Sequence, residues 1–244
     1  MKKILFYFTV FSAVCVSAQI NTDRPTQSFS PHVMPKGGIQ LETGFLSERP
    51  VSNVDAFNVT YLNALLRYGI SEWFELRMSE SYLGNRVNGN SQNGFSPLTL
   101  GTKIHINDQK NGLPQMGLLA SITLPSDDEN FGLDESIQDI RFMAQEDIGE
   151  RLTFDVNVGT FWSSSTDAVG LYTILLGISA SDHLSFFLEP YGFFQKNTPA
   201  DNRFNAGFTY LVNDQFQLDF SAGNGLTSKA PDYFVAFGAS FLFN

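Results

Sequence analysis

The sequence predicts an all-β chain that crosses a membrane as an antiparallel up-and-down β-barrel of about twelve strands. Three observations support this fold class. Apolar and polar residues alternate with a period of two in runs of roughly ten residues. The connections between these runs are alternately short and long. The mean hydropathy is only −0.08, as expected for a barrel in which every second residue meets lipid.

The first 18 residues have the features of a cleaved secretory signal peptide. Lys2 and Lys3 form a positive start, residues 4–16 are almost wholly apolar, and small residues precede a cleavage site before Gln19. The apolar run is too short to span about 30 Å of hydrocarbon as a helix. A lipoprotein attached through Cys15 is the less favoured alternative, because a valine precedes this cysteine where a small residue is expected. After cleavage the chain contains no cysteine, so it can form no disulfide.

Residues 19–37 are rich in Thr, Ser, Pro and Asn and show little alternation, so we expect an irregular segment before the first strand. We interpret this segment as a candidate lumen plug that folds into the periplasmic mouth of the barrel. In that arrangement Asp23 and Arg24 would pair with charges on the inner wall. A disordered leader is the alternative.

Residues 38–244 should form the barrel. The alternation is clearest at 152–159, where Leu, Phe, Val and Val alternate with Thr, Asp, Asn and Gly, and similar patterns occur at 98–105 and 216–223. No comparable helical periodicity follows the signal peptide. The twelve expected strands are 38–49, 56–68, 74–83, 98–106, 115–125, 136–145, 152–162, 169–179, 184–194, 203–212, 216–223 and 232–243.

The connections between these strands alternate in length. Those at one end, such as 107–114 and 213–215, are fairly short. Longer polar links rich in Asn, Gly, Ser and Asp are expected at 84–97, 126–135, 163–168, 195–202 and 224–231. Bacterial outer-membrane barrels have short periplasmic turns and longer outside loops. The pattern therefore predicts the cell outer membrane of a Gram-negative bacterium, with both termini in the periplasm; a soluble all-β protein is the alternative.

The apolar row of each strand should face lipid, because an unpaired charge in hydrocarbon costs roughly 2–4 kcal/mol at mid-depth. The opposite row should then line the lumen, where charges of both signs have to pair or meet water. The candidate lumen-lining and transport residues are Glu42, Arg67, Glu75, Arg77, Lys103, Asp139, Arg141, Asp155, Glu189 and Asp219. They either fill a closed barrel as buried ion pairs or line a polar pathway for solute, and the sequence leaves both open.

The composition argues against several other functions. Lys and Arg together number 15 against 25 Asp and Glu, so nucleic acid is not an expected partner. Cysteine and histidine are too scarce for a metal site, and we expect no cofactor. The acidic run at 127–129 lacks the residue spacing of a defined calcium-binding loop, so we expect a solvated outside loop there.

Some outer-membrane barrels are lipid hydrolases, which need a serine and a histidine with a polar orienting residue. Only three histidines occur here, and no Gly-x-Ser-x-Gly elbow is present. His105 is the one histidine on an expected strand, and a hydrogen-bonded lumen residue is its favoured role. We therefore expect no enzymatic activity, with a lipid-modifying barrel enzyme as a distant alternative.

Several short strings, in a shared order, resemble one family. They include Thr22–Pro25, Leu65–Ile70, Phe74–Arg77 and Leu188–Gly192. On these motifs the chain resembles the outer-membrane transporter-like family named for the meta-cleavage pathway of phenol degradation. The resemblance covers essentially the whole exported chain.

The resemblance implies a barrel that takes up small-molecule solutes, with hydrophobic or aromatic compounds as the suggested class. It also implies contact with outer-membrane lipid, and with barrel-assembly machinery during biogenesis. The chain departs from the family pattern at Ser126, where glycine is common, and at Asn244, where assembly machinery usually reads a terminal aromatic residue. The leading expectation is an outer-membrane pore or transporter for small solutes. A closed structural or surface-interaction barrel is the main alternative.

Overall fold

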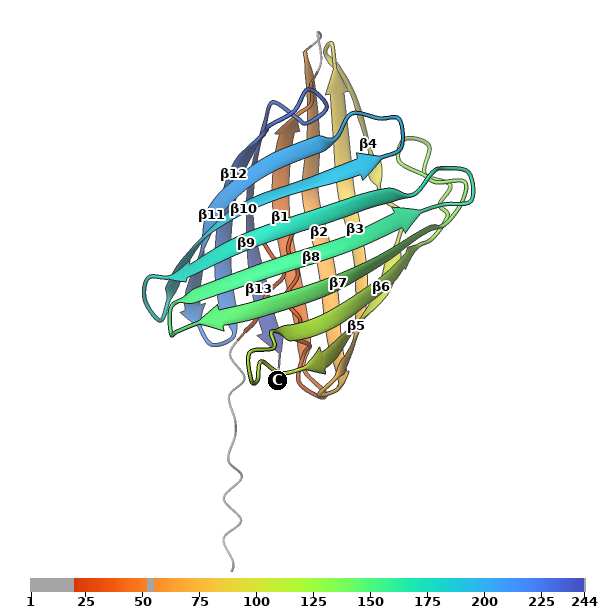
Figure 1. Ribbon diagram of the computed structural model, residues 1–244. Coiled ribbons are helices and arrows are strands. Elements are labelled where there is room, and N and C mark those ends of the chain that lie inside the picture. Colours follow the sequence, from red (N-terminus) through yellow and green to blue (C-terminus); the bar gives the residue numbers. More distant parts are fainter. Residues whose placement is uncertain (1–19, 52–54, 244) are drawn as a thin grey trace, which may run out of the picture.

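The structure is a computed structural model that describes residues 20–51 and 55–243. The expected signal peptide at 1–18 lies outside the described residues. Within them, thirteen antiparallel strands form one sheet that closes into a barrel (Figure 1). The strands are β1 (Ile39–Arg49), β2 (Ala56–Ser71), β3 (Phe74–Val87), β4 (Asn90–Phe95), β5 (Thr99–Asn107), β6 (Gln115–Thr123), β7 (Ile137–Ile148), β8 (Leu152–Trp162), β9 (Val169–Ser179), β10 (Leu184–Gln195), β11 (Asp201–Asn213), β12 (Phe216–Gly225) and β13 (Tyr233–Phe243).

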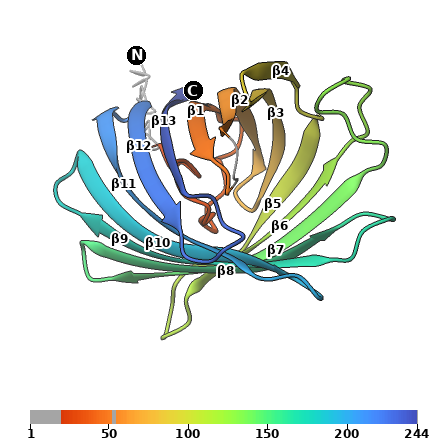
Figure 2. The same cartoon turned by 90° about the horizontal axis from the view of Figure 1, so that it is seen from above.

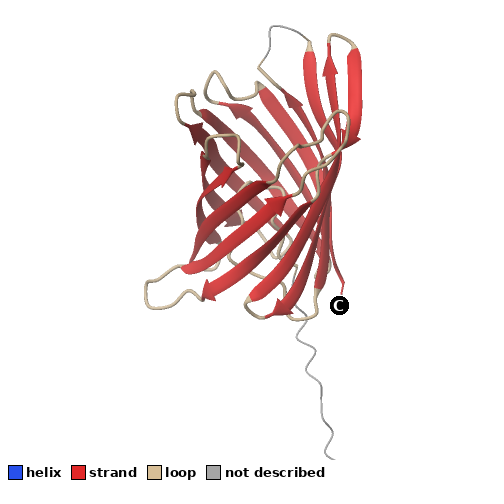
Figure 3. Cartoon of the chain, turned by 90° about the vertical axis from the view of Figure 1, so that its right-hand side faces the viewer, coloured by secondary structure: helices blue, strands red, loops and turns tan. Residues whose placement is uncertain are grey.

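Twelve of these described strands form the barrel wall, and β4 is an additional strand outside it. β1 pairs with β13 from Ile39, opposite Phe243, to Arg49, opposite Tyr233, and it also pairs with β2. Along the wall each strand pairs with its sequence neighbour, except that β3 is followed by β5. The predicted twelve-strand antiparallel barrel is confirmed, and Figure 3 shows its strands tilted around the wall.

The link expected at 84–97 differs from the prediction, because it forms a β-hairpin rather than a loop. β3 continues to Val87, a turn at Asn88 and Gly89 follows, and β4 returns beside β3. Both turn residues have positive φ, 50° and 86°, which suits the Asn-Gly pair of a two-residue turn. The hairpin is polar and mostly exposed, so its sequence has no apolar alternation that would have predicted a strand.

The two ends of the barrel differ in their connections. At the end where β1 begins and β13 ends, short turns at 72–73, 149–151 and 214–215 join the strands. The opposite end carries longer connections, including the loop 124–136 and the β3–β4 hairpin that rises at the top of Figure 1. No helix among the described residues is long and apolar enough to cross a membrane.

The two faces of the wall have opposite chemistry. Large apolar side chains on the outer face are exposed, as with Leu76 at 45% and Phe237 at 55%. The inner face carries polar and charged side chains, among which Glu42, Glu75 and Lys103 are completely buried. A water-soluble fold buries its apolar residues instead. The outer face therefore suits hydrocarbon, and the polar groups inside must satisfy one another.

Candidate functional site

The N-terminal segment, residues 20–38, lies inside the ring of strands (Figure 2). Near its start, the backbone amide of Ile20 donates a hydrogen bond to the carbonyl of Asp214 in the β11–β12 turn, at 3.0 Å. Near its end, the Gly37 amide donates to the Gly69 carbonyl on β2, at 2.8 Å. Both contacts lie at the short-turn end. The segment therefore enters and leaves the lumen through the same mouth.

Two glutamates of the wall bind the backbone of this segment. Glu42 on β1 accepts hydrogen bonds from both amides of residues 23–24, at 3.1 and 3.0 Å. Glu189 on β10 accepts from both amides of residues 27–28, at 2.9 and 2.6 Å, and from the side-chain amide of Asn205. Hydrogen bonds to an ionised acceptor are stronger than neutral ones. These two carboxylates therefore hold the segment through its backbone amides, and no cationic side chain is needed at these contacts.

A buried cluster of six charged groups, the central charge cluster, joins the segment to β1, β2, β3 and β5. Its members are Asp23, Glu42, Arg67, Glu75, Arg77 and Lys103. Glu75 accepts hydrogen bonds from Arg67 at 2.9 Å and from Arg77 at 2.8 Å. The Asp23 carboxylate accepts from Arg77 at 2.5 Å and from Lys103 at 2.9 Å. Three cations thus face three anions, and the buried cluster is neutral.

Arg24 reaches from the segment to Asp219 on β12. Its Nη2 and Nε atoms donate to the Asp219 carboxylate at 3.1 and 3.3 Å. The guanidinium lies against Gly44 on β1 and Gly238 on β13, where a Cβ atom on either glycine would collide with it. The wall therefore has glycine at the two positions that must leave room for this side chain.

Phe29 lies among cations of the wall, and no sequence pattern indicated this role. Its ring centroid is 4.8 Å from the guanidinium of Arg141, 5.2 Å from that of Arg77 and 5.9 Å from the Lys103 ammonium, within cation–π range. Asn157 on β8 accepts from the Phe29 amide at 2.7 Å and donates to its carbonyl at 3.1 Å. Strand parity could have identified Asn157, which shares the inward row of β8. An irregular segment offers no such periodicity for Phe29.

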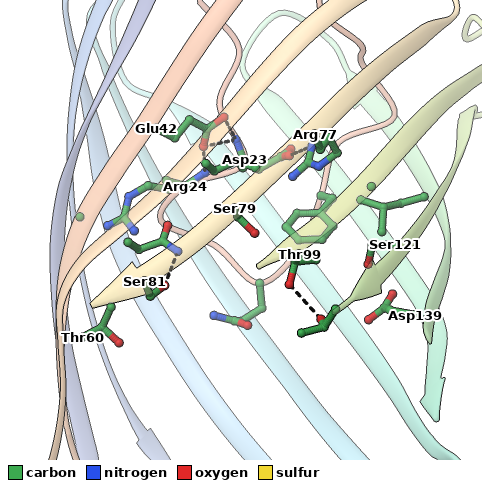
Figure 4. A pocket seen from close by; sticks show the side chains of 18 of the residues that line it. Asp23, Arg24, Glu42, Thr60, Arg77, Ser79, Ser81, Thr99, Ser121 and Asp139 are labelled. Carbon is green, nitrogen blue, oxygen red and sulfur yellow. Dashed lines mark hydrogen bonds and ion pairs between the residues drawn. The ribbon is translucent and has the colours of Figure 1, made fainter. Parts of the chain in front are cut away.

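A cavity of about 530 Å³, the outer cavity, lies on the long-loop side of the segment (Figure 4). Phe29 and Phe161 give it aromatic surface, and the ion pair of Asp139 and Arg141, 3.1 Å apart, also lines it. The rest of its lining is rich in hydroxyl groups from β2, β3, β5 and β6. These hydroxyl residues are Thr60, Ser79, Ser81, Thr99, Ser121 and Thr123.

A second cavity of about 260 Å³, the inner cavity, lies on the short-turn side of the segment. Its wall includes Asp155 on β8, Leu175 on β9 and Phe187 on β10. Arg24 and Thr26 of the segment line both cavities. The segment therefore divides the lumen into two spaces that share these two side chains.

His32 lies in the segment near the short-turn mouth. Gln115 on β6 donates its side-chain amide to Nδ1 of His32 at 3.2 Å, so this ring nitrogen must be unprotonated. The His32 carbonyl accepts from Lys103 at 3.3 Å. Burial lowers the pKa of His32 below its ordinary value, and the Lys103 ammonium lowers it further. The ring is therefore held in its neutral form.

The ten candidate lumen-lining residues all project from the inner face of the wall, where they take different positions. Five belong to the central charge cluster, and the Asp139–Arg141 pair borders the outer cavity. Glu189 and Asp219 hold the segment through its backbone and through Arg24. Asp155 stands apart, because it has no ionic partner among the described residues and lines the inner cavity.

His105 does not have the surroundings of a hydrolytic histidine. Its Nε2 atom is 3.0 Å from the carboxylate of Asp108, and its Nδ1 atom is 3.4 Å from the Pro31 carbonyl. Neither ring nitrogen contacts a hydroxyl group in the described part of the chain. A serine nucleophile would need such a contact.

Comparison with solved structures identifies outer-membrane channels as similar folds. An outer membrane channel from Pseudomonas putida F1 superposes with a TM-score of 0.70 at 13% identity, covering 90% of this chain and 100% of that one. The KdgM porin in complex with disordered oligogalacturonate gives 0.58 at 9% identity, covering 85% and 99%. The translocator domain of the autotransporter NalP from Neisseria meningitidis gives 0.58 at 10% identity, covering 86% and 90%.

Comparison of sequences gives the family. No curated protein matches the chain. The family model described as "Putative MetA-pathway of phenol degradation" matches residues 22–243. This match includes residues 22–38 of the segment inside the lumen as well as every strand of the wall. The chain, an outer-membrane β-barrel with the fold of a channel, therefore belongs to that phenol-degradation family.

Proposed function

We propose that this protein is an outer-membrane channel for small solutes, in which the N-terminal segment is a lumen plug and solute passes beside it. The observation that carries the proposal is the pair of cavities on the two sides of the segment, which share Arg24 and Thr26. A lumen filled only for stability would be packed as densely as a protein core. Membership of the family and the channel fold support a transport role.

The outer cavity suits a small solute that has an aromatic or other apolar part. Phe29 and Phe161 offer apolar surface, and the hydroxyl groups of the wall can bind polar substituents. The charged lining residues are Asp23, Glu42, Asp139, Arg24, Arg77 and Arg141, three of each sign. Because these charges balance, the outer cavity selects by size and polarity rather than by the sign of a charge.

The barrel would be oriented with both termini in the periplasm. The short turns lie at the end where β1 begins and β13 ends, and outer-membrane barrels have their short turns on the periplasmic side. The apolar outer face would contact outer-membrane lipid after insertion by barrel-assembly machinery. We assign no enzymatic role, in keeping with the surroundings of His105.

A closed structural barrel is the second candidate, and one observation favours it. Part of the central charge cluster is fully buried, because Glu75 and Lys103 are 0% exposed and line none of the cavities described above. Such a cluster can stabilise a barrel without any transport. Measurement of solute flux separates this candidate from a channel.

The experiment compares solute flux through variants at the residues shared by the two cavities. The protein is placed in liposomes for swelling in arabinose and in planar bilayers for conductance. The double substitution Arg24→Ala with Asp219→Asn removes the guanidinium without leaving a buried carboxylate unpaired. We expect faster swelling and higher conductance than in the wild type. Lys196→Ala, which removes a positive charge from an exposed loop, is the control and should change neither.

A cross-linked variant tests whether the segment stays in place during passage. The hydroxyl oxygens of Ser28 and Thr173 are 2.7 Å apart, so cysteines at these two positions can form a disulfide between segment and wall. We expect the cross-linked protein to conduct, with no change when a reductant is added. Conductance that appears only after reduction would show that the segment has to leave. No flux through any variant would establish the closed barrel.

A further inference from the structure

Asp155 on β8 is the exception among the inward carboxylates. The residue is 7% exposed, and its Oδ1 atom is buried without a hydrogen-bond partner in the described part of the chain. The other inward carboxylates have donors, such as Arg24 at Asp219 and two backbone amides at Glu189. Burying an ionised carboxylate without a partner is costly. The Asp155 carboxylate therefore either takes up a proton or pairs with a cation that the described part of the chain does not supply.

The surroundings of Asp155 leave its charge available to a ligand. Its carboxylate lines the inner cavity, whose only other charged lining residue in the described chain is Arg24. That guanidinium is already bound to Asp219 at 3.1 Å. The residues opposite Asp155 on the neighbouring strands are Gln145 and Leu175, and neither carries a charge.

We propose that the inner cavity binds a small organic ammonium ion, with Asp155 as its counter-ion. The ammonium would donate to Asp155, while the hydroxyl oxygens of Thr153 and Ser28 offer further acceptors in the same cavity. Leu175 and Phe187 supply apolar surface for the rest of the molecule. A divalent metal ion is less suited, because it prefers several oxygen ligands with more negative charge.

This assignment rests on the proposed function, because a solute has to reach the inner cavity through the lumen. It adds to that function the chemical class of one solute, a small organic ammonium ion. The outer cavity is balanced in charge, whereas the inner cavity contains one carboxylate without a counter-ion. Discrimination by charge therefore takes place in the inner cavity, after the solute has passed Arg24.

The test measures binding without requiring transport. Isothermal titration calorimetry of the full chain in detergent uses benzylammonium chloride, with benzyl alcohol as an uncharged analogue of similar shape. We expect saturable benzylammonium binding that is at least about tenfold tighter than benzyl alcohol binding, as for a charge-assisted hydrogen bond. Asp155→Asn keeps the side-chain volume and should weaken benzylammonium binding by about tenfold or more. A heat-dependent shift in gel mobility confirms that the variant is folded.

Asp182→Asn is the matched control, since it removes the same charge from an exposed turn near the same end of the barrel. It should leave benzylammonium binding unchanged. The proposed site would be overturned if the wild type showed no saturable benzylammonium binding, or if Asp155→Asn bound benzylammonium as tightly as the wild type. It would also be overturned if Asp182→Asn lost as much affinity as Asp155→Asn. Binding by a protein that shows no flux would keep the site and refute the channel. Flux without benzylammonium binding would keep the channel and refute the site.

Discussion

Glu75→Gln should destabilise the protein and leave its ion selectivity unchanged. Glu75 is 0% exposed and lines neither the outer nor the inner cavity. Its carboxylate accepts hydrogen bonds from Arg67, Arg77 and the amide of Met34. The substitution would leave three cations facing two anions in the central charge cluster. Removing one partner from a buried ion pair costs about 3–5 kcal/mol, so we expect the free energy of unfolding to fall by that amount.

Two measurements on the same variants check this expectation. Guanidinium chloride unfolding in detergent, followed by the fluorescence of Trp73 and Trp162, gives stability, and reversal potentials in planar bilayers give selectivity. Asp139→Asn is the matched control, since it removes the same charge at a side chain that is 16% exposed and borders the outer cavity. This variant should shift selectivity towards anions and lose less stability.

A double variant tests whether the loss of stability in Glu75→Gln comes from the charge imbalance in the cluster. Combining Glu75→Gln with Arg77→Gln leaves two cations and two anions in the cluster. The double variant should lose less stability than the sum of the two single variants, because the two groups are in contact. Unchanged stability of Glu75→Gln, or a selectivity shift as large as that of Asp139→Asn, would refute the reasoning.

Two further predictions concern pH and the long-loop end. Because the pKa of folded His32 lies below its ordinary value of 6.5, the unfolded state binds more protons below that pH, and stability should fall as the pH is lowered. His32→Asn should remove this part of the pH dependence of unfolding; an unchanged dependence would contradict it. Asp128 accepts two backbone amide hydrogen bonds within loop 124–136 and one from Phe95 on β4; all three lower its pKa, and the last holds the loop against β4. Asp128→Ala should therefore make that loop cleavable by protease added to intact cells, and cleavage equal to that of the wild type would contradict it.

The fold was predictable because its wall obeys one local rule. Period-two alternation marks most wall strands, although β9 is largely apolar on both faces, and the structure has strands in all twelve expected places. The β3–β4 hairpin was not predicted as strands, because polar residues lie on both of its faces. Its Asn88-Gly89 turn was the one local signal that could have indicated it.

The interior was less predictable, because its contacts join residues far apart in the chain. Parity places Glu75 and Arg77 on one face, and pairing of neighbouring strands brings Arg67 beside them. No periodicity leads from Arg24 to Asp219, which lies 195 positions away. The path of an irregular segment depends on side chains from many strands at once, and a single sequence does not reveal it.

The charges of the wall indicate that the segment completes the barrel. The wall contributes Arg67, Arg77 and Lys103 to the central charge cluster but only two glutamates, and Asp23 of the segment supplies the third negative charge. Withdrawal of the segment would break the ion pairs of Asp23 with Arg77 and Lys103 and that of Arg24 with Asp219, and it would leave three cations of the wall facing two glutamates. A channel that opened by releasing the whole segment would lose these interactions at every opening. In the proposed channel we therefore expect solute to pass with the segment in place, through movements of side chains such as Arg24 that border both cavities.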